Sequence, residues 1–70
     1  MTGAEFLRRV KRLGRQRGVT TNLLQSRGKG SHGLLVFGAR QTVLKDLKKE
    51  IKQGLLHSYC RDLGIDRSDL

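Results

Sequence analysis

Residues 31–44 read SHGLLVFGARQTVL, and this stretch decides the fold that we expect for the chain. The apolar run of residues 34–37 predicts a strand over residues 31–38, because short apolar runs bounded by glycine are typical of buried strands. Gly38 and Ala39 fit a tight hairpin connection. The sequence RQTVL then predicts an antiparallel strand over residues 40–44.

The segment before this hairpin predicts one further strand. Residues 19–26 read VTTNLLQS, which is rich in β-branched and apolar residues and has no helical pattern. We therefore expect a strand over residues 18–26, joined to the next strand by a turn at Gly28, Lys29 and Gly30. Together the three strands predict an antiparallel meander.

A helix is predicted on each side of the meander. Thr2 and Glu5 form a capping-box pattern, and the apolar stripe that follows predicts a helix over residues 3–14 with Gly14 as its C-cap. A second apolar stripe predicts a helix over residues 54–63, ended by Gly64 and Ile65 in the arrangement of a Schellman cap.

These elements predict an α+β fold in which two helices cover one face of a three-stranded antiparallel sheet. The order is helix, strand, strand, strand, helix, in a single domain that spans residues 1–70. The segment of residues 45–54 is ambiguous, because Leu47 and Ile51 lie four apart as on a helix whereas Gly54 interrupts the pattern, and we expect a short turn or loop first. The polar tail of residues 66–70 is expected to fray.

The charge balance points to a polyanionic partner. The chain has 15 Lys and Arg against 6 Asp and Glu, a formal net charge of +9. Residues 8–17 hold six of the basic residues and no acid, so the first helix is amphipathic and basic, with Arg8, Arg12 and Arg15 as candidate contacts to an RNA backbone. A purely solvated face and a membrane-surface helix are the alternatives for this helix.

Other classes of site find little support. Cys60 is the only cysteine, so no intramolecular disulfide forms, and it lies on an apolar stripe where a core role is expected. His57 lies three residues before it, but two ligands do not make a zinc site. We expect no metal and no cofactor. No apolar run reaches membrane-spanning length and no signal sequence is apparent, so a cytoplasmic location without membrane partners is expected.

The sequence GKGSHG of residues 28–33 is the strongest candidate site. Imidazole titrates near neutrality, so His32 is the candidate catalytic acid or base for RNA, which carries its own nucleophile in the 2′-OH. Lys29 and Ser31 are candidate phosphate contacts, and the backbones of Gly28 and Gly30 could form an anion-binding nest. The alternative is a hairpin whose histidine simply faces water.

These features together resemble the HicA toxin family. The resemblance rests on the motif of residues 28–33, Arg40 and Thr42 in an R-x-T pattern, the lysine-rich turn with Lys48 and Glu50, K-x-G-L-L at residues 52–56 and L-G-I at residues 63–65. It covers nearly the whole chain. Lys45 stands where many relatives have a proline.

The resemblance implies a double-stranded-RNA-binding-domain-like fold and a metal-independent, mRNA-cleaving toxin with His32 as the catalytic histidine. It also implies a HicB-type antitoxin that binds the toxin and occludes this site. Two alternatives remain open from the residues: a non-catalytic RNA-binding module of the same fold, in which His32 only hydrogen-bonds RNA, and an interaction subunit for an acidic protein.

Overall fold

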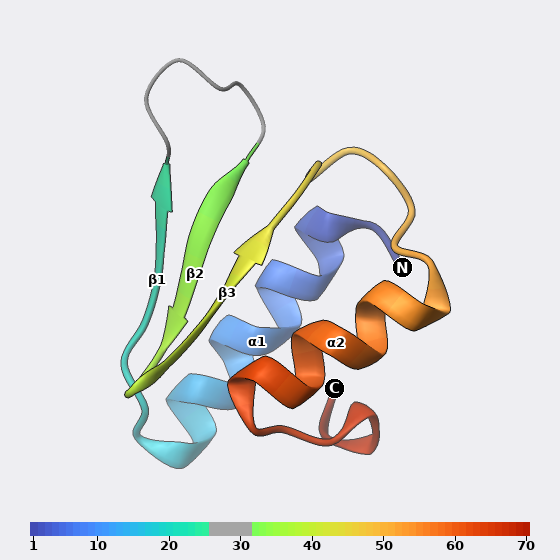
Figure 1. Ribbon diagram of the computed structural model, residues 1–70. Coiled ribbons are helices and arrows are strands. Elements are labelled where there is room, and N and C mark those ends of the chain that lie inside the picture. The colour runs from blue at the N-terminus through green and yellow to red at the C-terminus, as the bar shows by residue number, and fades with distance from the viewer. Residues whose placement is uncertain (26–31) are drawn as a thin grey trace.

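The computed structural model describes residues 1–25 and 32–70 (Figure 1). The chain forms α1 (Gly3–Arg17), β1 (Thr21–Gln25), β2 (Gly33–Phe37), β3 (Arg40–Leu44), α2 (Gln53–Leu63) and a short 3₁₀ helix, η1 (Arg67–Asp69). The predicted α+β class and the helix, three strands, helix order are confirmed. The predicted turn at residues 28–30 lies outside the described residues.

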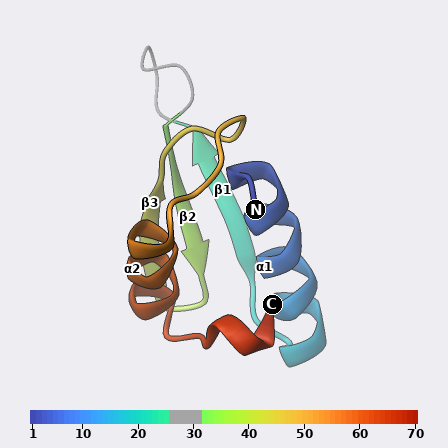
Figure 2. The same ribbon diagram turned by 90° about the vertical axis from the view of Figure 1, so that its right-hand side faces the viewer.

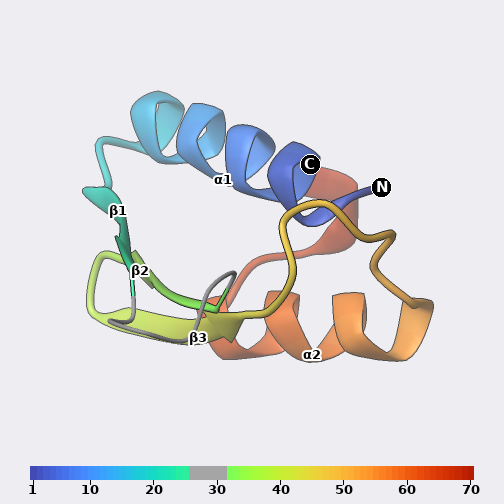
Figure 3. The same ribbon diagram turned by 90° about the horizontal axis from the view of Figure 1, so that it is seen from above.

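The sheet has the strand order β1-β2-β3, and both pairs are antiparallel. Phe37 pairs with Arg40 across the Gly38-Ala39 connection, so the predicted hairpin is confirmed. Leu35 and Phe37 alternate with less buried neighbours, which gives the sheet one buried face. Both helices lie on that face, α1 against β1 and β2 and α2 against β3 (Figure 3).

The first helix begins as predicted and ends later. The Thr2 hydroxyl accepts a hydrogen bond from the Glu5 backbone N–H at 3.2 Å, so the N-cap is confirmed. The predicted end at Gly14 is wrong, because Gly18 is the left-handed C-cap, with φ at 67°. The chain leaves this cap through Val19 and Thr20, and β1 therefore begins at residue 21 rather than 18.

Gly14 serves packing instead of capping. A Cβ atom at this position would lie 2.2 Å from the Thr21 hydroxyl oxygen and 2.8 Å from the Val19 carbonyl oxygen. Only a glycine lets the helix backbone approach the start of β1 this closely. Gly14, predicted as the C-cap, is therefore the residue at which α1 packs closely against the start of β1.

The second helix matches its prediction closely. Gly64 adopts φ of 69°, and the Ile65 N–H donates to the Cys60 carbonyl at 3.0 Å, as in a Schellman cap. Ile65 is buried beside the helix end. Partly buried side chains, among them Leu23 of β1, pack against a core of buried residues: Phe6, Val10, Leu13, Leu35, Phe37, Leu44, Ile51, Leu56, Tyr59, Cys60, Leu63 and Ile65.

The segment between β3 and α2 begins as a loop, as expected, and the helical spacing of Leu47 and Ile51 does not produce a helix there. The segment is hydrogen-bonded to the start of the chain. The N–H groups of Gly3 and Ala4 donate to the Lys49 and Leu47 carbonyls at 3.1 and 2.9 Å. These N–H groups have no partner within the first turn of a helix. The loop therefore caps α1 and is itself held in place beside the candidate site.

The C-terminal tail does not fray, contrary to the expectation. Residues 66–70 turn back from α2 toward the end of α1 (Figure 2). Asp66 caps η1, and the Asp69 carboxylate pairs with Arg17 at 3.0 Å. The Arg9 guanidinium also donates to the Leu70 carbonyl at 3.5 Å. Polar side chains thus anchor a tail whose composition suggested disorder.

Candidate functional site

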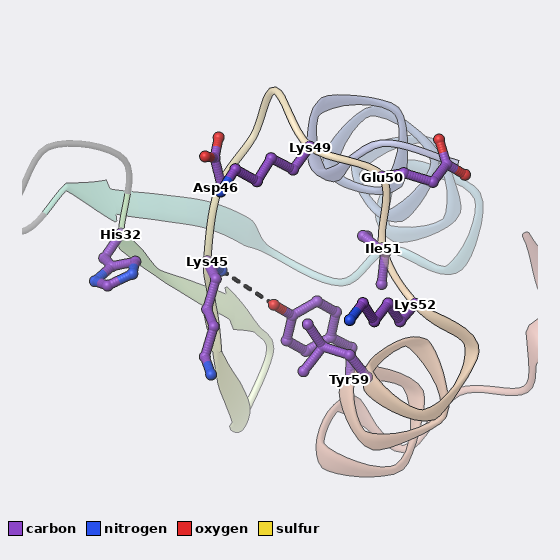
Figure 4. A pocket seen from close by; sticks show the side chains of 9 residues that line it. His32, Lys45, Asp46, Lys49, Glu50, Ile51, Lys52 and Tyr59 are labelled. Atoms are coloured by element: carbon purple, nitrogen blue, oxygen red, sulfur yellow. Dashed lines mark hydrogen bonds between the residues drawn. The ribbon is translucent and has the colours of Figure 1, made fainter.

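His32 lies directly before β2, at the end of the sheet where β3 finishes, and its side chain is exposed. The last paired residues of this hairpin are Gly33 and Leu44. Continuing the same register by one residue places His32 opposite Lys45. Figure 4 shows the two side chains on neighbouring segments of this end of the sheet.

A pocket of about 320 Å³ opens beside this pair. Its walls come from three places in the sequence: the start of β2, the loop before α2, and the first turns of α2. The residues that line it are His32, Lys45, Asp46, Lys49, Glu50, Ile51, Lys52, Leu55 and Tyr59. Buried apolar side chains form its base and charged side chains its rim, which suits a polar ligand that lies across the opening.

The rim is cationic where it faces His32. Lys45, Lys49 and Lys52 are exposed, and within residues 1–25 and 32–70 none of them forms an ion pair. The two carboxylates of the rim are engaged elsewhere. Asp46 accepts a hydrogen bond from the Lys48 N–H at 2.9 Å, and Glu50 pairs with the N-terminal ammonium.

Figure 4 shows the carboxylates of Asp46 and Glu50 turned away from the ammonium of Lys45. The local field at the opening is therefore set by the lysines and favours an anion. A phosphodiester is an anion of suitable charge and size for this pocket.

Tyr59 fixes the position of Lys45. The backbone N–H of Lys45 donates to the Tyr59 hydroxyl oxygen at 3.0 Å, and the Tyr59 side chain is buried. The Tyr59 ring also packs against Phe6, with 5.4 Å between ring centroids. One aromatic side chain thus connects the end of β3 to both helices, and Tyr59 is a positioning residue for the site.

The arginines predicted on the first helix form a separate group. Arg8, Arg9, Arg12 and Arg15 surround a shallow recess of about 360 Å³ on α1. None of them lines the pocket that His32 shares with the lysines. Glu5 lies 2.9 Å from Arg9 and 3.9 Å from Arg8, whereas Arg12 and Arg15 have no ion pair in the described part of the chain.

Four of the predicted site residues lie outside the described residues: Gly28, Lys29, Gly30 and Ser31. The lysines at 45, 49 and 52 were missed, because the segment that carries them was interpreted only as a loop. A signal for Lys45 was present in the sequence. The hairpin centred on Gly38 and Ala39 pairs residues at equal distances from its turn, and this symmetry already relates residue 32 to residue 45.

The second histidine and the cysteine lie elsewhere. Cys60 is buried in the core as predicted, and burial raises the pKa of its thiol. His57 is exposed on α2 and does not line the pocket of His32. Within the described ranges, no three His, Cys, Asp or Glu side chains gather as a group that could hold a metal ion.

Comparisons with known proteins found no matching family model, no matching curated protein and no matching solved structure. In the part of the chain that the structure describes, neither helix combines the length and the apolar character needed to cross a membrane.

Proposed function

We propose that this chain is a metal-independent endoribonuclease of the HicA type, an mRNA-cleaving toxin of a toxin–antitoxin pair. The observation that supports the proposal most is the exposed His32 at the rim of a pocket whose cations have no ion-pair partner among the described residues. The family resemblance noted in the sequence agrees with this chemistry.

The proposed reaction uses the nucleophile of the substrate. The ribose 2′-OH attacks the adjacent phosphorus, its proton passes to a base, and the bond from phosphorus to the 5′-oxygen breaks. A proton supplied to that oxygen gives a 5′-OH product and a 2′,3′-cyclic phosphate. His32 acts as the base, as the acid, or as both in turn, and DNA, which lacks the 2′-OH, is not a substrate.

The lysines of the rim supply the electrostatic part of the mechanism. Negative charge accumulates on the phosphorane oxygens in the transition state, and a cation held beside them lowers the barrier. Lys45, opposite His32, is the nearest candidate by strand register, and Lys52 lines the same pocket from the start of α2. Lys29 remains a further candidate.

The proposal is tested by replacing His32 with alanine and incubating a long mRNA with the pure protein in EDTA. We expect cleavage to fall by about 10²-fold or more, the usual contribution of a positioned acid or base. His57→Ala is the matched control, because it removes the other exposed histidine. Full cleavage by the His32 variant would refute the proposed role.

An RNA-binding module without catalysis is the second candidate. The arginine recess on α1 supports it, because this recess lies apart from the pocket of His32 and needs no chemistry to bind phosphates. Wild-type protein that retains RNA in a gel and leaves its length unchanged over hours would favour this function.

The toxin proposal includes a cytoplasmic location and a HicB-type antitoxin that occludes His32. A complex with such a partner should bind RNA weakly and cleave none. Co-purification of an acidic protein alone would equally suit an interaction subunit, so cleavage before and after removal of the partner separates the two.

A further inference from the structure

The edge of the sheet at β1 has no partner strand in the described part of the chain. The order β1-β2-β3 leaves one side of β1 free, and Figure 1 shows β1 as the outermost strand. Its residues, TNLLQ, include no charged side chain and no proline. Edge strands usually carry charged residues or proline, which block pairing with another chain. β1 lacks this protection in a chain rich in lysine and arginine.

The backbone groups on this free edge can be identified from the register. The Gly38 N–H donates to the Thr20 carbonyl at 2.8 Å, so residues 20 and 38 form a hydrogen-bonded pair. Such pairs alternate along an antiparallel ladder. The N–H and C=O groups of Thr21 and Leu23 therefore point away from β2. Within the described residues they make no hydrogen bond outside the β1–β2 ladder.

A cationic hollow lies at the start of the same edge. Lys11 and Arg15 of α1 and Val19 and Thr21 beside them line an open hollow of about 400 Å³. Leu7, one helical turn before Lys11, is half-buried against the core. Figures 2 and 3 both show α1 lying alongside β1. Lys11 and Arg15 form no ion pair among the described residues.

We propose that the free edge of β1 accepts an extended segment of an acidic protein, which adds a strand to the sheet and sets carboxylates against Lys11 and Arg15. Strand addition satisfies the outward N–H and C=O groups, and alternate side chains of the added strand face α1. The matching segment alternates Asp or Glu with apolar residues. The proposal does not depend on the chemistry of His32.

Charge and hydrogen bonding favour this occupant over two others. A second copy of the chain would bring a net charge of +9 against another +9. A nucleic-acid backbone offers phosphate acceptors to the N–H groups of Thr21 and Leu23, but a phosphodiester has no donor for their carbonyl oxygens. Only a peptide strand supplies both at the required spacing.

The test uses the ¹⁵N-labelled full chain and the capped hexapeptide EVEIEV, with EVEPEV and KVKIKV as matched peptides. At saturation with EVEIEV we expect amide hydrogen exchange at Thr21 and Leu23 to slow about tenfold, because both N–H groups become hydrogen-bonded. EVEPEV and KVKIKV should bind at least about tenfold more weakly, because one loses a ladder hydrogen bond and the other reverses the charge.

A pair of variants tests the position. Lys11→Glu should raise the dissociation constant for EVEIEV about tenfold, whereas Lys48→Glu, the same charge change in the loop before α2, should leave it within about twofold. Circular dichroism checks that both variants are folded. Unchanged exchange at Thr21 and Leu23, equal binding of EVEPEV, or equal losses in both variants would overturn the proposal. Slower exchange of these amides on addition of a short RNA duplex, without peptide, would also overturn it. So would exchange that slows when the protein concentration alone is raised, because a second copy would then occupy the edge.

Discussion

The backbone and the side chain of Lys45 make separate contributions to the candidate site. Its backbone N–H is held by the buried hydroxyl of Tyr59, and its side chain reaches the rim of the pocket that contains His32. The backbone contact persists in any substitution other than proline, so the ammonium can be removed without releasing the end of β3. This separation makes Lys45 the most informative position in the site after His32.

In the proposed ribonuclease, Lys45→Ala should lower kcat by about 10²-fold, the loss expected when one group that stabilises transition-state charge is removed. RNA affinity should change less, because the many other cations of the chain would still attract the phosphates of the RNA. Single-turnover cleavage of a defined RNA measures this.

Lys48→Ala is the matched control for Lys45, because Lys48 is an exposed lysine of the same loop that does not line the pocket. Equal loss of cleavage in the two variants would show that general charge, and not the place opposite His32, is responsible.

At the scale of elements, the contact of α1 with β1 depends on one missing side chain. Gly14 lies within the helix, where alanine would ordinarily stabilise the protein by about 0.5–1 kcal/mol. Its packing against Thr21 and Val19 reverses this expectation, because a new methyl group has no room. The two effects oppose each other, and the steric cost of overpacking is the larger.

Gly14→Ala should therefore reduce the free energy of unfolding by about 1–3 kcal/mol, as overpacked sites do. Gly54→Ala provides the comparison, since nothing lies within 4 Å of a Cβ placed at Gly54 in the first turn of α2. That variant should be neutral or gain up to about 1 kcal/mol. Urea denaturation of both variants measures the difference, and a stabilised Gly14 variant would contradict the packing described above.

At the scale of the whole molecule, the C-terminal tail connects the end of α2 to the C-terminal end of α1. Asp69 accepts a hydrogen bond from the Asp66 N–H and pairs with Arg17, both at 3.0 Å. The Asp66 N–H first, and Arg17 second, lower the pKa of the Asp69 carboxyl in the folded protein. The unfolded chain binds a proton at this carboxyl more readily, so folding favours the ionised form.

The tail contact should consequently add stability at neutral pH and lose it as the pH falls below about 4, the ordinary pKa of an aspartate. Asp69→Asn should lower the melting temperature at pH 6, and the gap to wild type should narrow on acidification toward pH 3. When Arg17→Ala is present in both proteins, Asp69→Asn should lower the melting temperature by a smaller amount. A gap that is constant across this range would show that the ionised carboxylate does not hold the tail.

Much of the molecule follows from local pattern. The apolar run before Gly38 and the alternation after it determined the hairpin, and the left-handed glycine with a following isoleucine determined the end of α2. These signals act within a few residues, where backbone sterics and the alternation of side chains leave few options. For the same reason the sequence alone indicated a basic first helix and a histidine directly before a strand.

The tertiary structure decided what depends on approach between distant segments. A glycine at position 14 is compatible with a helix C-cap and with a close backbone contact. Only the position of Thr21 beside Gly14 in the folded protein shows that the close contact is its role. The lysines around His32 all come from the segment between β3 and α2, whose position depends on Tyr59 and on the N-terminus of α1. Sequence thus determined the elements and the charge, whereas packing determined which charges share a pocket, because long-range contacts are selected by the free energy of the whole core.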